Sequence, residues 1–521
     1  VQIYLSLFKN FMRIETLLFK EIVILPELFL GISLVYLVLH CTFLAIKKNY
    51  PLIQNSVLYL GVLVLFLSCF LVLNDGLDVL EQSVLNDTIV NDYLSFFSKL
   101  VIGSLSLFCL LMIQPYLTSQ KINQFEYILL ILFAVLGLFL LCSSNDLLTA
   151  YLAIELQSLA FYVLASFKKN STHSVDAGIK YFILGAFSSS LFLFGSSLLY
   201  GVTGTINFEE FKDLFVNVFP GNHDVILNEI SLFDFSLVQF GLVFILISLL
   251  FKLAIAPFHT WAPDVYEGSP SSSTFFFSVV PKLAIFVLLL RIFYYSFFGF
   301  FESWRYFIVI VVVLSIIVGS FGGLEQRKLK SLLVYSSISH MGYALIAFSA
   351  GTFESIQMLL CYLVVYSFSG LCVWSIFILT RLKNNHLQKQ NKDLTDLVLL
   401  GKSNYMLAIF FTTVLFSVAG FPPMIGFLVK ISVFLTAIES SMFFVVLISI
   451  LCSVVGTFYY IRLIKILYFE KVLVGKLYYP IQVQSSVLIS LLFFLFLFLF
   501  INPTLLYLFS YKISLLVSTA V

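Results

Sequence analysis

Apolar residues follow one another in long blocks along this chain, and short polar loops separate the blocks. Each block is about 20 residues or longer, the length that a helix needs to cross a bilayer. The pattern therefore predicts about fourteen transmembrane helices. They are placed near residues 22–46, 52–74, 94–113, 122–142, 146–167, 175–203, 235–260, 274–298, 304–323, 329–350, 356–381, 402–438, 443–468 and 484–510. Barrel strands would alternate polar and apolar residues over about ten positions, so an outer-membrane barrel is excluded.

The spacing of these helices predicts an internal repeat. Predicted helices 4 to 6 and 9 to 11 begin at a nearly constant offset of roughly 180 residues. Five helices per unit is an odd number, so the second unit enters the membrane from the opposite face, as in many secondary transporters. The predicted fold is thus an all-α polytopic membrane protein with two inverted five-helix repeats. Its parts are an N-terminal unit at 1–121, a first repeat at 122–298, a second repeat at 304–468 and a C-terminal helix at 484–521.

Two of the predicted helices contain a break beside a lysine, at corresponding places in the two repeats. The seventh has Lys252 and then Pro257, and the twelfth has Pro422 and Pro423 and then Lys430. Proline has no amide hydrogen and kinks or breaks a helix. Paired broken helices in the two halves of such a fold indicate the ion site.

The fifth predicted helix carries Glu155 near its middle. Tyr151, Glu155, Ser158 and Tyr162 follow at spacings that place them on one helix face. A polar face inside a membrane is expected to face protein or water rather than lipid. The face therefore predicts a gate or a proton relay, and a structural ion pair between helices is the alternative reading.

Further titratable residues lie deep in the predicted helices. Lys282 is about nine residues into its helix, roughly 13 Å, which is too deep for its amine to reach the surface. Lys282 and Lys430 are therefore predicted to carry protons or to couple charges. His340 and His259 are candidate relays, although a hydrogen-bonded packing histidine is an equal alternative for each. For Lys252 the alternative is a packed lysine beside an ordinary proline kink.

Composition supports the membrane assignment and excludes other classes. Hydrophobic residues make up 61% of the 521 residues and charged residues 11%, so a soluble core could not hide the apolar surface. The seven cysteines never form a CxxC pair, which argues against an iron–sulfur or zinc site. The chain shows neither a nucleotide-binding motif nor a basic patch for nucleic acid.

Charges in the loops predict the orientation of the helices. Lysines gather after odd-numbered helices, and acidic residues gather after helices 2 and 6. The positive-inside rule therefore places the ends of the odd-numbered helices on the cytoplasm-equivalent side and both termini on the other side. Cations within reach of a surface, Lys99 and Arg291 among them, are expected to extend their charged ends towards it.

Five segments of the chain resemble subunit 2 of respiratory complex I, which is called subunit N in bacteria. They are YLAIELQSLAFYVLASFK, KYFILGAFSSSLFLFGSSLLYG, APFHTWAPDVYEGSP, VYSSISHMGYALIA and FSVAGFPPMIGFLVK. PDVYEG resembles subunit 2 rather than the related subunits 4 and 5. The similarity runs from about residue 120 to 440.

The resemblance implies a proton-translocating, antiporter-like subunit of the membrane arm. Glu155 would be the glutamate that pairs with Lys252, Lys282 would be the central lysine, and Lys430 would be the lysine that faces the outer exit. The chain would be a non-redox subunit of NADH:ubiquinone reductase. NADH, flavin, iron–sulfur clusters and ubiquinone would be bound by other subunits.

The resemblance also implies partners and a location. The expected partners are other membrane-arm subunits, namely subunits 4 and 4L, together with lipids, and no nucleic acid. The 60 phenylalanines fit an AT-rich organelle genome, so the mitochondrial inner membrane is expected rather than a bacterial plasma membrane. A subunit of a cation/proton antiporter or of a membrane-bound hydrogenase is the alternative, and a purely structural spacer is a further one.

Overall fold

The computed structural model describes residues 24–45, 50–74, 82–120, 122, 124–215, 235–384, 387–390, 393–398, 400–470 and 478–519. The predicted N-terminal unit at 1–121 begins outside these residues. Several of the charged loop positions, including 46–49, 75–81 and 471–477, also lie outside them.

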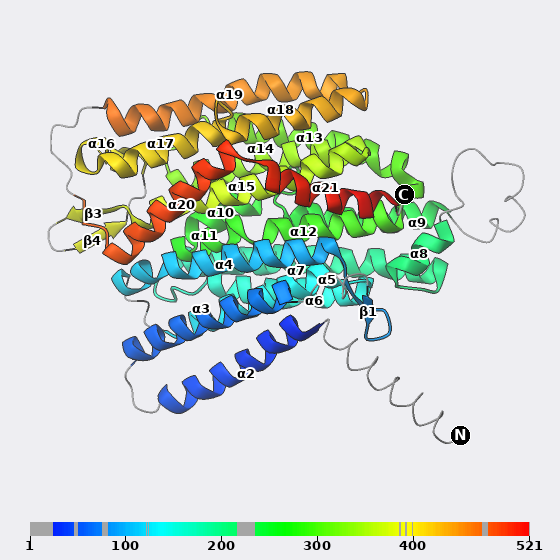
Figure 1. The fold of residues 1–521 in the computed structure, drawn as a ribbon, viewed down its shortest axis with the longest axis horizontal. Coiled ribbons are helices and arrows are strands. Elements are labelled where there is room, and N and C mark those ends of the chain that lie inside the picture. Colours follow the sequence, from blue (N-terminus) through cyan, green and yellow to red (C-terminus); the bar gives the residue numbers. More distant parts are fainter. Residues whose placement is uncertain are drawn as a thin grey trace, which may run out of the picture.

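Long helices that lie roughly parallel make up the body of the molecule (Figure 1). The first half contains α2 (Leu25–Ala45), α3 (Tyr50–Asn74), α4 (Tyr93–Ser119), α5 (Glu126–Ser143), α6 (Leu147–Ala165), α7 (Thr172–Thr203), α8 (Phe208–Phe215), α9 (Phe235–Lys252), α10 (Trp261–Gly268), α11 (Ser271–Val279), α12 (Pro281–Leu289), the π-helix η4 (Leu290–Ser296) and the 3-10 turn η5 (Phe298–Phe300). Two short strands, β1 (Gln82–Val84) and β2 (Ile89–Asn91), pair antiparallel between α3 and α4.

The second half continues the same packing. It contains α13 (Phe301–Gly322), α14 (Leu329–Ala350), α15 (Phe353–Leu379), η6 (Leu394–Leu397), α16 (Leu400–Ser403), α17 (Tyr405–Ala419), α18 (Ile425–Glu439), α19 (Phe443–Tyr468), α20 (Val483–Ile501) and α21 (Thr504–Thr519). The antiparallel hairpin of β3 (Arg381–Asn384) and β4 (Leu387–Gln390) follows α15. The β3–β4 hairpin lies at one end of the bundle, and α8 lies at the opposite end (Figure 1).

The structure confirms an all-α polytopic membrane fold. Within the described ranges, thirteen helices are long and apolar enough to cross a membrane. The remaining predicted crossing, 402–438, contains the two shorter helices α17 and α18. The boundaries proposed for the two repeats stay a prediction.

Burial is greatest in the middle of the bundle. The most apolar window of the span formed by α11, α12 and η4 is completely buried, and 94% of the corresponding window of α14 is buried. The corresponding share in α2, at the edge of the bundle, is only 28% (Figure 1). Lys282 lies in the first of these spans and His340 in α14, so both belong to the best-shielded helices.

Both predicted breaks are present, and two further interruptions were not predicted. Helix α9 ends at Lys252, and α17 ends just before Gly420. The predicted continuous helix at 274–298 is instead divided before Pro281, which is the first residue of α12. The reason is the missing amide hydrogen of Pro281. The predicted helix at 484–510 is likewise divided, at Asn502 and Pro503.

Two cations expected at the surface are buried in ion pairs. Lys99 Nζ lies 2.5 Å from Glu27 Oε1, and both side chains are less than 4% exposed. Arg291 Nη2 lies 2.7 Å from Asp92 Oδ1, and its Nε donates to the carbonyl of Cys142. The prediction was wrong because hydropathy cannot show which face of a helix a neighbouring helix covers. Glu27 lies on α2, which therefore brings the partner for Lys99 on α4.

Candidate functional site

Lys252 lies at the end of the helix that carries it. Its Nζ donates to the Tyr162 hydroxyl on α6, at 3.3 Å, and lies 5.7 Å from the centre of that ring. After it the chain leaves the helical path, and Ala254 has a φ of 58°. A cation at a helix C-terminus is stabilised by the carbonyl groups that end there. The break thus provides a polar setting for the lysine.

Glu155 does not touch Lys252 in this conformation. Its Oε2 accepts a hydrogen bond from Ser158 at 3.3 Å, and no ion pair joins it to Lys252 among the described residues. Glu155, Ser158 and Tyr162 share a face of α6, so the Tyr162 hydroxyl replaces the carboxylate as the partner of Lys252. The direct pairing that the resemblance implied is therefore absent here.

Lys282 is the second residue of α12, directly after the break at Pro281. It is 5% exposed. Its Nζ donates to the Tyr366 hydroxyl on α15 at 2.9 Å and lies 4.9 Å from the centre of that ring. The Tyr366 hydroxyl is the only polar partner recorded for this amine within the described part of the chain.

His340 joins three helices. Its Nδ1 lies 2.6 Å from the Tyr362 hydroxyl on α15, and its Nε2 lies 3.3 Å from the Tyr460 hydroxyl on α19. A neutral imidazole donates from one ring nitrogen and accepts at the other, so both contacts are satisfied at once. The ring also lies 5.2 Å from the ring of Tyr366, the partner of Lys282. His340 therefore lies directly beside the Lys282 pair.

Lys430 binds the open end of the helix before it. Its Nζ donates to the carbonyls of Val418 and Ala419, the last two residues of α17, at 2.8 and 3.0 Å. These carbonyls have no amide partner further along the helix. Gly420 has a φ of 86°, and a Cβ there would lie 3.0 Å from Lys430 Cδ. Glycine at this position thus permits both the turn and the close approach of the lysine.

Two small cavities separate His340 from Lys430. Both side chains line each cavity, and Tyr366 also lines the larger one. The volumes are about 20 and 10 Å³. A cavity holds a water molecule when about 10 to 15 Å³ is open to it and polar groups line it. The larger cavity is therefore the size of a single water site between Tyr366, His340 and Lys430.

The structure does not connect all the predicted residues. Lys252 and Lys282 share no hydrogen-bond partner. Near Lys252 lie stacked or tilted aromatic pairs, such as Tyr181 with Trp261, at a centroid distance of 4.7 Å. His259 lies in the break after α9, and its buried Nδ1 has no hydrogen-bond partner in the described part of the chain. Its role as a relay stays a prediction.

The tyrosines on α15 are the main residues that the sequence prediction missed. Tyr362 and Tyr366 lie four residues apart in an apolar helix and therefore on one face. The spacing of four residues could have identified this pair in the sequence, because the same spacing identified the polar face around Glu155. No three His, Cys, Asp or Glu side chains within the described ranges are placed to hold a metal ion.

Outside the membrane-spanning segments, the carboxyl group of Asp146 has a raised pKa. Asp146 directly precedes α6, the helix that carries Glu155. Burial raises the pKa of its carboxyl to about 6. Its Oδ1 is buried without a hydrogen-bond partner, which fits a carboxyl group that takes up a proton easily.

Comparisons with known proteins identify the family of the chain. The family described as NADH:quinone oxidoreductase/Mrp antiporter, TM matches residues 144–456. The chain is 38% identical to NADH-ubiquinone oxidoreductase chain 2 of Marchantia polymorpha, over 94% of this chain and 97% of that one. It is 39% identical to NADH-quinone oxidoreductase subunit N of Pelagibacter ubique, over 86% of this chain and 89% of the relative.

Solved structures show the same fold. A chain of respiratory complex I from Thermus thermophilus superposes with a TM-score of 0.74 at 26% identity, covering 92% of this chain and 98% of that chain. Chains of an archaeal membrane-bound sulfane sulfur reductase and of the Mrp complex from Dietzia share the fold at TM-scores of 0.79 and 0.76. They are only 21% and 18% identical, and each match covers 94% of this chain and 96% of the other. The chain therefore belongs to the family of NADH-ubiquinone oxidoreductase chain 2 and NADH-quinone oxidoreductase subunit N, within the NADH:quinone oxidoreductase/Mrp antiporter membrane proteins.

Proposed function

We propose that this chain is a proton-translocating subunit of the complex I membrane arm. It contributes to NADH:ubiquinone oxidoreductase without taking part in the redox chemistry itself. The observation that carries the proposal is the placement of three shielded lysines, Lys252, Lys282 and Lys430, each at a helix interruption in a membrane-spanning bundle. Membership of the complex I subunit family supports the assignment.

We call Lys252, Lys282 and Lys430 the lysine row. In this proposal protons are transferred along its second half, from Lys282 to Lys430. The Tyr366 hydroxyl accepts a proton from Lys282 and releases its own to a water molecule in the larger cavity. His340 accepts that proton at Nδ1 through the Tyr362 hydroxyl and releases the proton of Nε2 through the Tyr460 hydroxyl, and the proton then reaches Lys430 through water in the smaller cavity. The contacts of 2.9 Å at Lys282 and the cavity shared by His340 and Lys430 support this route.

In this proposal Glu155 and Lys252 regulate the proton affinity of Lys282. Charges in a low-dielectric interior interact over distances that water would screen, so a change in the Glu155–Lys252 separation alters the proton affinity of Lys282. Moving one proton against about 100 mV requires roughly 2.3 kcal/mol, which a modest change in interaction at one buried lysine supplies. The separated arrangement seen here, with Tyr162 on Lys252, serves as one of the two states.

Partners, cofactors and location follow from the same assignment. Glu155 is half-buried on a face of α6 that exposes Leu152 and Leu159, and this fits contact with a neighbouring subunit. We assign subunits 4 and 4L as the neighbours and the mitochondrial inner membrane as the location, supported by the relatives named chain 2 in plants. The chain itself binds no NADH, flavin, iron–sulfur cluster or quinone in this proposal, and lipids cover its outer faces.

The experiment is a measurement of proton pumping per NADH oxidised in complexes that carry Lys430→Ala. Loss of the amine removes the last proton-holding group of the row, so pumping is expected to fall while assembly persists. Lys465→Ala, which removes an exposed cation at the end of α19, is the matched control. Normal pumping with Lys430→Ala would instead favour a structural spacer. Recovery of the chain without any flavin or iron–sulfur subunit would favour a separate cation/proton antiporter.

A further inference from the structure

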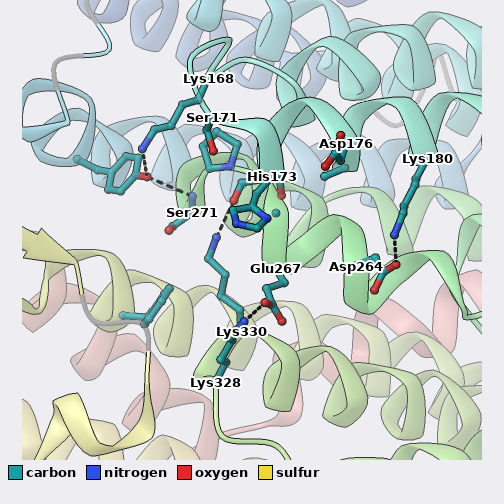
Figure 2. Close-up of a pocket in the computed structure, with 16 residues that line it drawn as sticks. Lys168, Ser171, His173, Asp176, Lys180, Asp264, Glu267, Ser271, Lys328 and Lys330 are labelled. Carbon is teal, nitrogen blue, oxygen red and sulfur yellow. Dashed lines mark hydrogen bonds and ion pairs between the residues drawn. The ribbon is translucent and has the colours of Figure 1, made fainter.

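A separate cavity lies between the α6–α7 connection and the start of α14 (Figure 2). Its volume is about 430 Å³, and it contains none of the residues of the lysine row. Its walls come from the α6–α7 connection, α10, the link to α11, the start of α14 and the end of α15. The cavity therefore has to be explained independently of proton transfer.

Positive charge exceeds negative charge around this cavity. Four lysines line it, Lys168, Lys180, Lys328 and Lys330, against three acids, Asp176, Asp264 and Glu267. Lys180 pairs with Asp264 at 2.5 Å, and Lys328 pairs with Glu267 (Figure 2). All four of these side chains are exposed. Lys168 instead donates to neutral oxygens, the Tyr116 hydroxyl at 3.4 Å and Gln120 Oε1 at 3.0 Å. An anion would thus find at least one ammonium group that no carboxylate neutralises.

Three helices begin at the cavity wall. They are α7, α11 and α14, with N-cap residues Ser171, Pro270 and Lys328, and none of these caps makes a side-chain hydrogen bond to its helix. The first amide groups of a helix lack partners within the helix, and the helix dipole adds partial positive charge there. One of these amides, that of Ser271, donates to the Tyr116 hydroxyl at 3.3 Å. Convergent helix N-termini favour a bound oxyanion.

The hydroxyl of Ser269 gives an independent indication of a ligand. Ser269 lines the cavity and is 2% exposed, yet its Oγ has no hydrogen-bond partner in the described part of the chain. Its carbonyl is engaged, because Lys330 donates to it at 2.7 Å. A buried hydroxyl without a partner is costly, and a ligand oxygen would satisfy it.

We propose that this cavity binds a phosphate group through Lys168, Ser269 and the helix N-termini of α7, α11 and α14. Phosphate fits better than a monovalent halide because its several acceptor oxygens can meet ammonium, hydroxyl and amide donors together. The source is either the headgroup of an anionic phospholipid or free phosphate. Basic pockets between membrane helices on the positive side bind anionic headgroups, and the cavity has space for the glycerol as well.

The test measures protection of Lys168 from an amine-reactive reagent in the purified complex, read by peptide mass spectrometry. Inorganic phosphate in detergent, phosphatidylglycerol vesicles and phosphatidylcholine vesicles are compared. We expect labelling of Lys168 to fall severalfold, while Lys169, its exposed neighbour outside the cavity, is labelled equally throughout. Protection by phosphate alone identifies the free ion as the source. Protection only by phosphatidylglycerol identifies a lipid headgroup.

Two variants test whether the protection of Lys168 depends on the proposed phosphate site. Ser269→Ala removes one donor with little change of shape, and the phosphate or lipid concentration for half-protection is expected to rise about tenfold. Lys169→Ala changes the net charge beside the site and is expected to leave that concentration unchanged. Absence of protection by every additive, or the same protection in Ser269→Ala as in the unchanged chain, would overturn the proposal. Pumping need not change in either variant, so this result is separable from the proton-path experiment.

Discussion

The three lysines Lys252, Lys282 and Lys430 meet two kinds of oxygen. Lys252 and Lys282 donate to tyrosine hydroxyls, whereas Lys430 donates to the backbone carbonyls that end α17. A hydroxyl both donates and accepts, so it can pass a proton on, whereas a carbonyl only accepts. From the chemistry of these partners we propose Lys282 as a transfer site and Lys430 as a holding site.

A substitution of His340 distinguishes a role in proton relay from a role in packing. His340→Gln keeps hydrogen-bonding groups towards Tyr362 and Tyr460, but an amide cannot exchange a proton at neutral pH. Pumping per NADH is therefore expected to fall by tenfold or more, within the range typical of lost proton transfer. The measurement is vesicle acidification during NADH oxidation. Unchanged acidification with His340→Gln would assign the histidine to packing.

The interruptions of the helices follow from particular residues. Pro257, Pro422 and Pro423 were sufficient to predict two of them, because proline removes a helix donor wherever it lies. The break before Pro281 was missed, since apolar residues continue on both sides of this proline, apart from Ser278 and Lys282, and favoured one continuous helix. Sequence alone thus located two of the lysine sites at breaks and placed Lys282 inside an unbroken helix.

Gly420→Ala tests whether the break before α18 positions Lys430. Alanine in a left-handed conformation costs about 1 to 2 kcal/mol, and its Cβ would also press on the lysine side chain. The melting temperature is expected to fall by several degrees, with a loss of pumping. Gly201→Ala, where an added Cβ would meet nothing within 4 Å, is the control. Equal melting temperatures for the two variants would contradict the assigned role of Gly420.

The carboxyl group that precedes α6 predicts a pH dependence. Because the pKa of Asp146 is raised from 3.8 to about 6 on folding, its protonated form stabilises the folded chain. This contribution is complete below about pH 4 and is lost as the pH rises through about 6. Asp146→Asn is expected to remove that loss and to melt higher than the unchanged chain at pH 7, by a few degrees. A melting curve with the same pH dependence in both proteins would contradict the burial argument.

At the scale of the whole molecule, the long apolar helices and their order were predictable, and side-chain partners were not. Hydropathy places a helix in the membrane but does not say which face a neighbour covers. This is why Lys99 was assigned to the surface, although α2 brings Glu27 against it (Figure 1). The same limit concealed Tyr362 and Tyr366, whose importance depends on α12 and α14 lying against α15.

The buried pair of Glu27 and Lys99 predicts how the N-terminal helices are attached. Lys99→Met leaves a buried carboxylate without its partner, and it is expected to cost about 3 to 5 kcal/mol of stability. The double variant Glu27→Met, Lys99→Met removes both charges and is expected to recover most of that loss. Thermal unfolding of the purified complexes measures both effects. A double variant as unstable as the single one would show that the pair does not act as a unit.

In the proposed mechanism protons move through this chain along Lys252, Lys282 and Lys430, and Lys282 is the group that tests this route most directly. The measurement is the number of protons pumped per NADH oxidised in an assembled complex that carries Lys282→Ala, beside Lys465→Ala as the surface control. The structure predicts a clear fall in that ratio for Lys282→Ala, because the amine that meets Tyr366 in the most buried helix is lost, and no change for the control. The same ratio in both variants, with normal assembly, would contradict the account.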